Sequence, residues 1–370
     1  MNQKTYLSLE NAWFWDTESY PNFSELQFRH AVTKETRAFT CYGADSQVTA
    51  KEIAKFIHGK TLLGFNSLAY DDFILLGIVY GKAITPKQIN ELSDKIIKYK
   101  GRAWQKEQAF PEFIGLAAMP KKTWLTVDVA SCIRQESQEN AGDEWLKGLK
   151  LLGAILRAES IQTLPFVPGT ILTPEQAETV SRYCAKDIDL LALLFNAVKS
   201  EIELKAYLAH ESGLDLINKI RASAAEEILV TELCKKSNTS RAQLRRAIPS
   251  YTGSLLLAKI VDPNLDTTKT PIVAEVYQNL KVTSLDFENP DWGTEVIIAG
   301  KTYSVGLGGL HSVDAPGLFR AVNGKWLGHA DVASYYPSII EKLQLHQKHL
   351  GPEFTRLVTA KKLARLQAKQ

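Results

Sequence analysis

The sequence predicts an α/β fold, with a mixed sheet flanked by helices, from two observations. Short alternating or apolar runs open the chain at 12–16, 25–32 and 37–42, with polar and turn-forming residues between them. This pattern is typical of an antiparallel meander. Helical spacing of apolar residues then appears near 48–58, ahead of a strand-like apolar run at 61–65. Strands that alternate with helices in this way indicate an α/β sheet.

The next segments are a predicted helix, an irregular stretch and a short strand. Apolar spacing resumes through Phe73, Leu76 and Val79, which favours a helix. The stretch 93–120 is basic and has a poor pattern, so we expect it to be an excursion on the surface. A strand-like run follows at 123–129.

The clearest predicted helix starts from Thr173 as its N-cap, with Pro174 at the first helical position, and continues to about Leu204. Serine, threonine and proline are favoured at these positions because they suit the first turn of a helix. Apolar residues at spacings of three and four form one stripe: 177, 180, 184, 188, 191, 195, 198 and 202. We place the first domain boundary just beyond this helix, between Tyr207 and Asp215.

The remaining chain reads as a series of shorter elements. These are a helical region at 214–234, a basic helix at 240–247, a linker at 261–271, a hairpin at 295–305, a glycine-rich segment at 306–312 and a strand at 326–332. The sequence therefore predicts three regions, at 1–210, 211–310 and 311–370.

The composition is that of an ordinary globular protein, with 370 residues, 45% hydrophobic and 23% charged. These values exclude a disordered, fibrous or small disulfide-rich protein. The 44 lysines and arginines against 41 acids give a formal net charge of +3. That charge is too small to indicate nucleic-acid binding by itself, so any such function must rest on local motifs.

Cysteine spacing and hydropathy point to a soluble protein in a reducing compartment. The four cysteines form no CxxC pair, so neither a zinc ribbon nor a disulfide framework is indicated. The first ten residues lack a signal-peptide core, and no apolar run approaches the roughly 20 residues that a bilayer crossing needs. We expect a cytoplasmic location and no membrane partner.

The first chemical signal is the pair Asp16 and Glu18, at the end of a strand-like run. Residues two apart on a strand project to the same face, so the two carboxylates converge. Paired like charges are costly unless a cation lies between them, and Mg²⁺ or Mn²⁺ prefers such oxygen ligands. The alternative interpretation is that Asp16 and Glu18 are an ordinary exposed pair of acids without a metal.

The second signal is the segment from Asn66 to Asp71, where a buried strand passes into a helix that begins near Asp71 or Asp72. Acids in a first helical turn are explained equally well by capping and by the helix dipole. This segment is therefore ambiguous on its own.

The third signal is Tyr183 and Asp187 on the long helix, four residues apart and so on one face. Asp187 lies beside the apolar stripe, between Cys184 and Leu191. A carboxylate against a buried stripe needs a partner. That partner is either a bound cation or a lysine or arginine in a salt bridge at the rim.

The three signals, in this order and spacing, resemble the exonuclease motifs of the DEDDy 3′-5′ exonucleases. The resemblance implies a ribonuclease H-like domain in which Asp16, Glu18, Asp71 and Asp187 hold two Mg²⁺ or Mn²⁺ ions. It also implies that Tyr183 orients the attacking water. Asn66 would then face the single-stranded primer end.

Other residues of this region have weaker expectations attached to them. The tract 145–159 resembles the helix that precedes the third motif, and we interpret it as core packing with a basic edge. Asp128 ends a strand and is expected to support the sheet rather than to bind metal. Trp13, Phe65 and Tyr70 could stack on DNA bases, although a core position is the preferred interpretation for Trp13 and Phe65.

A second signature lies at 331–340, where the sequence DVASYYPSII is similar to motif A of family B DNA polymerases. The resemblance implies that Asp331 holds the catalytic magnesium ion of a palm domain. It places Ser334 and Tyr335 at a helix start that receives a nucleoside triphosphate. Tyr336 would pack against the sugar as a steric gate.

The glycine-rich segment upstream is similar to the one that precedes motif A in phage and prophage polymerases of this family. Gly308 and Gly309 would allow close approach of the backbone to a phosphate chain, and a plain turn is the alternative. Gly306 stands where the family element has a tyrosine. Downstream, the basic segment 343–370 resembles the entry to the fingers and suits phosphate contact.

The chain given lacks the fingers motif and the second palm acid motif of such polymerases. Without that second carboxylate the polymerase two-metal site cannot close. The expectation is therefore the front part of a family B polymerase, of phage type, with a proofreading exonuclease, located in a bacterial host cytoplasm. DNA is the expected partner, the remaining polymerase segment is a second candidate partner, and nucleoside triphosphates would bind only with that segment present.

Two alternatives stay open from the sequence. One is a DNA-binding or assembly piece of a split polymerase, without catalysis of its own. The other is a stand-alone DEDDy exonuclease whose motif A is a relic.

Overall fold

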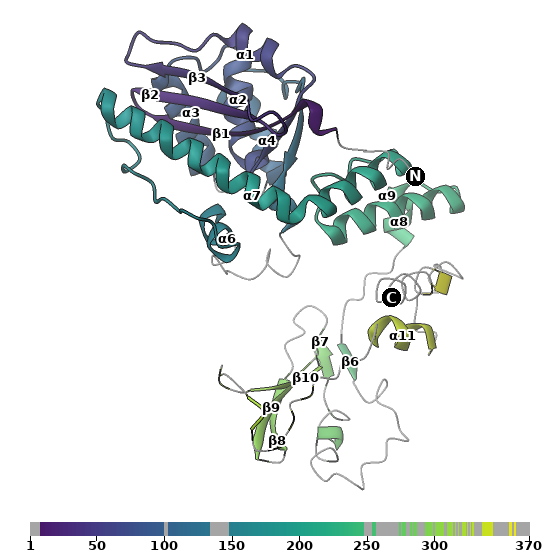
Figure 1. The fold of residues 1–370 in the computed structure, drawn as a ribbon. Coiled ribbons are helices and arrows are strands. Elements are labelled where there is room, and N and C mark those ends of the chain that lie inside the picture. The colour runs from purple at the N-terminus through teal and green to yellow at the C-terminus, as the bar shows by residue number, and fades with distance from the viewer. Residues whose placement is uncertain are drawn as a thin grey trace. The chain divides into compact units, whose positions relative to one another are not determined.

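The computed structural model describes residues 8–99, 103–133 and 148–247, together with short segments between 254 and 359. The chain divides into two compact units, Met1–Glu232 and Leu233–Gln370 (Figure 1). The division falls inside helix α8 (Arg221–Ser237), further along the chain than the boundary drawn from the sequence.

The first unit is built on a five-stranded mixed sheet. Its strands are β1 (Ala12–Tyr20), β2 (Phe23–His30), β3 (Thr36–Tyr42), β4 (Thr61–Gly64) and β5 (Leu125–Asp128), in the order β3-β2-β1-β4-β5. The first three pair antiparallel, which confirms the predicted meander. Strands β4 and β5 continue the sheet in parallel with β1, so an α/β architecture is established.

Helices cover both faces of this sheet. One face is covered by α1 (Ala50–Ile57), α2 (Asp71–Val79), α3 (Pro86–Lys98) and α4 (Ala103–Phe113), and the other by α6 (Leu149–Ile155) and α7 (Pro174–Ser212) (Figure 1). Short 3-10 turns lie at Leu9–Asn11, Ser67–Ala69 and Val129–Cys132. A further helix, α9 (Arg241–Ala247), follows α8.

Successive side chains of β1 project to opposite faces of the sheet. Trp13 and Trp15 are buried in the core formed with α1 to α4. Phe14 is buried in the other core, against Phe195 of α7 with the ring centroids 5.4 Å apart. Asp16 is two residues after Phe14 and projects to the same face of the sheet. Its carboxylate therefore lies on the side that α7 covers.

The stretch 93–120 is not the surface excursion that its pattern suggested. It contains the end of α3 and the whole of α4, and Ile96 and Phe110 are fully buried in the core. Thr85 caps α3 in a capping box with Gln88. The basic residues interrupt the apolar spacing on the exposed side, which hid the helical periodicity.

The long helix α7 begins as predicted and ends later than predicted. Thr173 accepts a hydrogen bond from the backbone N–H of Gln176 and forms a capping box, with Pro174 in the first turn. The helix ends at Ser212, where Gly213 adopts a φ of 70°. Glycine accommodates this left-handed conformation without strain, which makes it a common helix terminator.

Within its described residues, the second unit contains helix α9, two small antiparallel sheets and a further helix. The elements are β6 (Ser254–Leu256), β7 (Ser284–Asp286), β8 (Gly293–Ile298), β9 (Lys301–Gly306), β10 (Gly309–Ser312) and α11 (Tyr335–Lys342). The predicted hairpin is confirmed by the pairing of β8 with β9. The predicted linker at 261–271 lies outside the described residues. Among the helices the structure describes, none combines the length and the apolar character needed to span a bilayer.

Candidate metal centre

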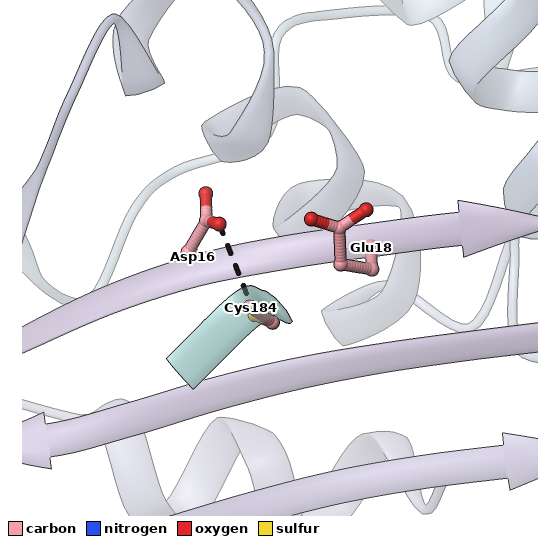
Figure 2. A group of neighbouring side chains, drawn as sticks. All are labelled: Asp16, Glu18 and Cys184. Carbon is pink, nitrogen blue, oxygen red and sulfur yellow. Dashed lines mark hydrogen bonds between the residues drawn. The ribbon is translucent and has the colours of Figure 1, made fainter. Parts of the chain in front are cut away.

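Two acids and a cysteine converge between β1 and α7. Asp16 and Glu18 project from the same side of β1, and Cys184 lies on the buried side of α7. One ligand atom from each of the three, a carboxylate oxygen or the Cys184 Sγ, lies within 4.8 Å of the others (Figure 2). The Cys184 thiol also donates a long hydrogen bond of 3.8 Å to Asp16 Oδ2. This group could hold a metal ion.

The electrostatics of the group are those of carboxylates crowded away from water. Burial raises the pKa of Asp16 to about 6, although the backbone N–H of Thr17 and the charge of Lys150 oppose the shift. Burial, followed by the charge of Asp16, raises the pKa of Glu18 well above its usual value. Burial also raises the pKa of the Cys184 thiol. A divalent cation would relieve this crowding, because it favours the ionised form of each ligand.

Lys150 supplies a positive charge to this cluster from α6. Its Nζ forms an ion pair with Asp187 Oδ1 and lies 4.3 Å from the ring centroid of Tyr183. Its charge lowers the pKa of both Asp16 and Glu18, so it acts on the carboxylates of β1 as well. Both α7 residues of the third motif are buried, at 7% and 8% exposed for Tyr183 and Asp187.

Asp71 reaches the same region from the start of α2. The turn before it begins at Asn66, whose φ of 57° is left-handed, a conformation that asparagine adopts more readily than most residues. Burial, then the charge of Asp16, raises the pKa of Asp71 well above its usual value. Asp71 and Asp187 do not belong to the group formed by Asp16, Glu18 and Cys184. Asp71 is related to that group by the charge of Asp16, and Asp187 by its ion pair with Lys150.

The two adjacent acids at the start of α2 have different roles. The carboxylate of Asp72 is 1% exposed and accepts hydrogen bonds from Thr126 Oγ1 at 2.7 Å and Trp124 Nε1 at 3.4 Å. It also forms an ion pair with Lys122. Asp72 is therefore satisfied by protein groups, whereas Asp71 faces other acids.

The aromatic residues considered for base stacking belong to the core. Trp13 is 5% exposed and packs edge-to-face against His30 and Phe56. Phe65 packs against the core on the side of α7. The hydroxyl of Tyr70 hydrogen-bonds Ser93 Oγ at 2.6 Å, which holds the ring inward.

The residues of the second signature are described in part. Gly309 opens β10, and Tyr335 and Tyr336 open α11, where Tyr336 is exposed. Gly308, Asp331 and Ser334 lie outside the described residues. A helix does begin at this point of the motif, as expected.

Lys150 and Cys184 are the members of the cluster that sequence reasoning passed over. The sequence pattern instead assigns Lys150 to a basic edge and Cys184 to an apolar stripe. Their positions relative to β1 depend on how α6 and α7 pack on the sheet, and local spacing does not reveal that packing. The signal for Cys184 was its position between Tyr183 and Asp187.

Comparisons of the chain with models of protein families, with curated proteins and with solved structures gave no match.

Proposed function

We propose that the first unit is a metal-dependent 3′-5′ exonuclease of the DEDDy type, within the front part of a family B DNA polymerase. The observation that carries the proposal is the convergence of acids from three separate motifs. Asp16 and Glu18 come from β1, Asp71 from the start of α2 and Asp187 from α7. The charge of Asp16 acts on Glu18 and Asp71, and Lys150, whose charge acts on Asp16 and Glu18, forms an ion pair with Asp187. The sheet, with three antiparallel strands followed by two parallel ones, is compatible with the ribonuclease H-like fold of such enzymes.

The donor set fits divalent cations of the magnesium and manganese kind. Carboxylate oxygens are the preferred ligands of these ions, and Asp16, Glu18, Asp71 and Asp187 would hold two of them. Bound there, the ions would supply activated water and charge stabilisation for hydrolysis of a terminal phosphodiester. The Cys184 sulfur adds a softer donor beside Asp16, which favours Mn²⁺ or Zn²⁺ over Mg²⁺ at that position.

The chain's own residues would divide the remaining tasks. The Tyr183 hydroxyl would orient the attacking water, and Asn66 would contact the single-stranded 3′ end of DNA. Lys150 would balance the charge of Asp187 before a cation binds. In the second unit, Asp331, Ser334, Tyr335 and Tyr336 would serve a polymerase site, with Gly308 and Gly309 near the template. That site would take nucleoside triphosphates only together with a further polymerase segment.

Digestion of single-stranded DNA tests the proposal. A 5′-labelled oligonucleotide is incubated with the protein and Mn²⁺ or Mg²⁺, beside an EDTA control and the double variant Asp16→Ala/Glu18→Ala. We expect a ladder that shortens from the 3′ end, and its loss by roughly a thousandfold or more in the double variant. Binding of DNA without any ladder would instead favour a DNA-binding piece of a split polymerase.

A further inference from the structure

The turn that delivers Asp71 is held at its first residue by strand β5. The backbone N–H of Asn66 donates a 2.8 Å hydrogen bond to Asp128 Oδ1. The same oxygen accepts from the N–H of Ala130 at 3.1 Å, so the carboxylate is fixed in place by the chain that follows β5. A left-handed residue other than glycine is strained, and the bond from Asp128 stabilises Asn66 in that conformation.

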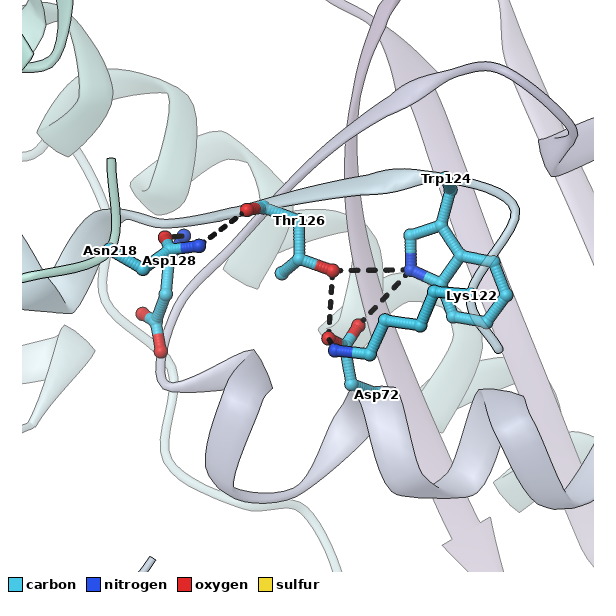
Figure 3. Close-up of polar contacts among 6 residues, drawn as sticks. All are labelled: Asp72, Lys122, Trp124, Thr126, Asp128 and Asn218. Carbon is cyan, nitrogen blue, oxygen red and sulfur yellow. Dashed lines mark hydrogen bonds and ion pairs between the residues drawn. The ribbon is translucent and has the colours of Figure 1, made fainter. Parts of the chain in front are cut away.

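The far end of the turn is held by the same strand. Asp72 directly follows Asp71, and its carboxylate accepts from Thr126 Oγ1 at 2.7 Å (Figure 3). Trp124 donates to both Thr126 and Asp72, at 3.1 Å and 3.4 Å. Lys122 completes the set with its ion pair to Asp72. The contacts among Asp72, Trp124 and Thr126 are buried, so water competes for them weakly.

Thr126 and Asp128 are two residues apart and share one side of β5. The strand itself is anchored independently by Asn218, from the segment after α7. Asn218 Nδ2 donates to the Thr126 carbonyl at 2.7 Å, and its Oδ1 accepts from the Asp128 N–H at 2.8 Å. Asn218 therefore binds the backbone of β5, while the side chains of Thr126 and Asp128 form hydrogen bonds with the turn.

Asp71 needs such support because its position is electrostatically unfavourable. It is only 7% exposed, and a buried carboxylate is costly unless a partner or a cation compensates its charge. A mobile turn would let the carboxylate move away from Asp16 toward water. Two attachments to one strand oppose that movement.

We infer that Asp72 and Asp128 are positioning residues, which clamp the two ends of the turn 66–72 to β5 and so fix the carboxylate of Asp71 in the metal centre. This inference rests on the proposed function. It assigns no ligand role to either residue, since both act through the backbone that carries Asp71.

The clamp is tested with paired substitutions that remove or keep one hydrogen bond. Thr126→Val removes the hydroxyl that binds Asp72 at nearly unchanged volume, and Thr126→Ser keeps it. Asp128→Ala removes the acceptor for Asn66, and Asp128→Asn keeps an oxygen there. Asn22→Ala is the control, because Asn22 makes a comparable two-bond clamp to Leu172, at 2.8 Å and 2.9 Å, away from Asp71.

The decisive readout is the Mn²⁺ dissociation constant of the folded protein, measured by electron paramagnetic resonance beside the thermal midpoint. We expect Thr126→Val and Asp128→Ala to weaken Mn²⁺ binding about tenfold, and Thr126→Ser and Asp128→Asn to restore it to within about threefold. Asn22→Ala should lower the thermal midpoint without changing the dissociation constant by more than about twofold. Equal Mn²⁺ affinity in Thr126→Val and wild type would overturn the inference.

Amide hydrogen exchange separates this inference from the proposed function. If wild-type protein binds no Mn²⁺, the proposed function fails, but exchange in the peptide that covers 66–72 still reports on the clamp. Faster exchange there in Thr126→Val than in Asn22→Ala supports the clamp. Equal exchange in the two variants refutes it.

Discussion

The Nζ of Lys150 forms an ion pair with Asp187 Oδ1, between helices α6 and α7. The ammonium group also lies over the ring of Tyr183, and its charge acts on Asp16 and Glu18. Burial lowers the pKa of Lys150, yet four acidic or phenolic neighbours surround it. A lysine thus serves as the internal counter-ion of the cluster, and we propose that a divalent cation at Asp187 would compete with it.

Replacement of Lys150 by methionine should therefore tighten cation binding and weaken the metal-free fold. We expect the Mn²⁺ dissociation constant of Lys150→Met to fall about tenfold, because a repelling charge is lost. Its thermal midpoint in EDTA should fall, since Asp187 loses its partner. Lys186→Met is the matched control, as Lys186 pairs with the exposed Asp189 at 3.3 Å. Unchanged Mn²⁺ affinity in Lys150→Met would contradict the competition.

The neighbouring acids Asp71 and Asp72 should respond in opposite ways to the same substitution. Asp71→Asn should abolish metal-dependent digestion and keep or raise the thermal midpoint in EDTA, because one crowded charge is removed. Asp72→Asn should lower the free energy of unfolding by about 3 kcal/mol, because Lys122 and Thr126 lose a charged partner. Thermal melts and digestion assays of the two variants check this. Similar melts for both would refute the division of roles.

Cation binding should weaken as pH falls through about 6. The pKa of Asp16 is raised to about 6 by burial, so protons compete with the cation for this carboxylate below that value. We expect Mn²⁺ affinity to fall by up to about tenfold per pH unit as the pH drops below about 6. Titrations between pH 5 and pH 8 measure it, and a flat profile would exclude Asp16 as a ligand.

The stability of the metal-free protein should show the opposite trend with pH. Asp16 takes up a proton near pH 6 in the folded chain but near its ordinary value of 3.8 in the unfolded chain. The folded state therefore binds more protons in this interval, and the unfolding free energy falls as pH rises from about 4 to 6. Denaturant melts in EDTA should show this slope, and Asp16→Asn should reduce it.

The Cys184 sulfur should contact a thiophilic metal directly. Cd²⁺ forms strong bonds to thiolates, so titration should produce a sulfur-to-metal charge-transfer band in the ultraviolet. Cys184→Ser should lose the band, whereas Cys41→Ser should keep it, because Cys41 is buried in the core on the other face of the sheet. A band that survives Cys184→Ser would remove the sulfur from the donor set.

Local signals predicted most of the first unit correctly. The alternation in 12–42 gave the antiparallel strands, and the cap formed by Thr173 and Pro174 gave the start of α7. The helices within 86–113 were missed in part, because lysines and polar residues on their exposed side mask the buried stripe that includes Ile96 and Phe110. Helical periodicity is weakest where only one narrow face is buried.

The site was predictable where the spacing of residues sets the geometry. Asp16 and Glu18 share a face of β1 because strands alternate, and Tyr183 and Asp187 share a face of α7. Two other contacts join segments that are far apart in the sequence: the ion pair of Lys150 with Asp187, and the hydrogen bond from the Asn66 N–H to Asp128. Such contacts follow from the packing of helices and strands on one another, so local sequence patterns do not predict them.

One comparison tests the exonuclease proposal most directly. It uses Asp187 and Asp189, two acids that lie two residues apart on α7. Asp187 faces the cluster, whereas Asp189 is exposed and pairs with Arg29 and Lys186. A 5′-labelled single-stranded oligonucleotide is digested in Mn²⁺ by wild type, Asp187→Asn and Asp189→Asn. We predict 3′ shortening by wild type and Asp189→Asn, and none by Asp187→Asn or in EDTA. Equal digestion by the two variants, or none by the wild type, would contradict it.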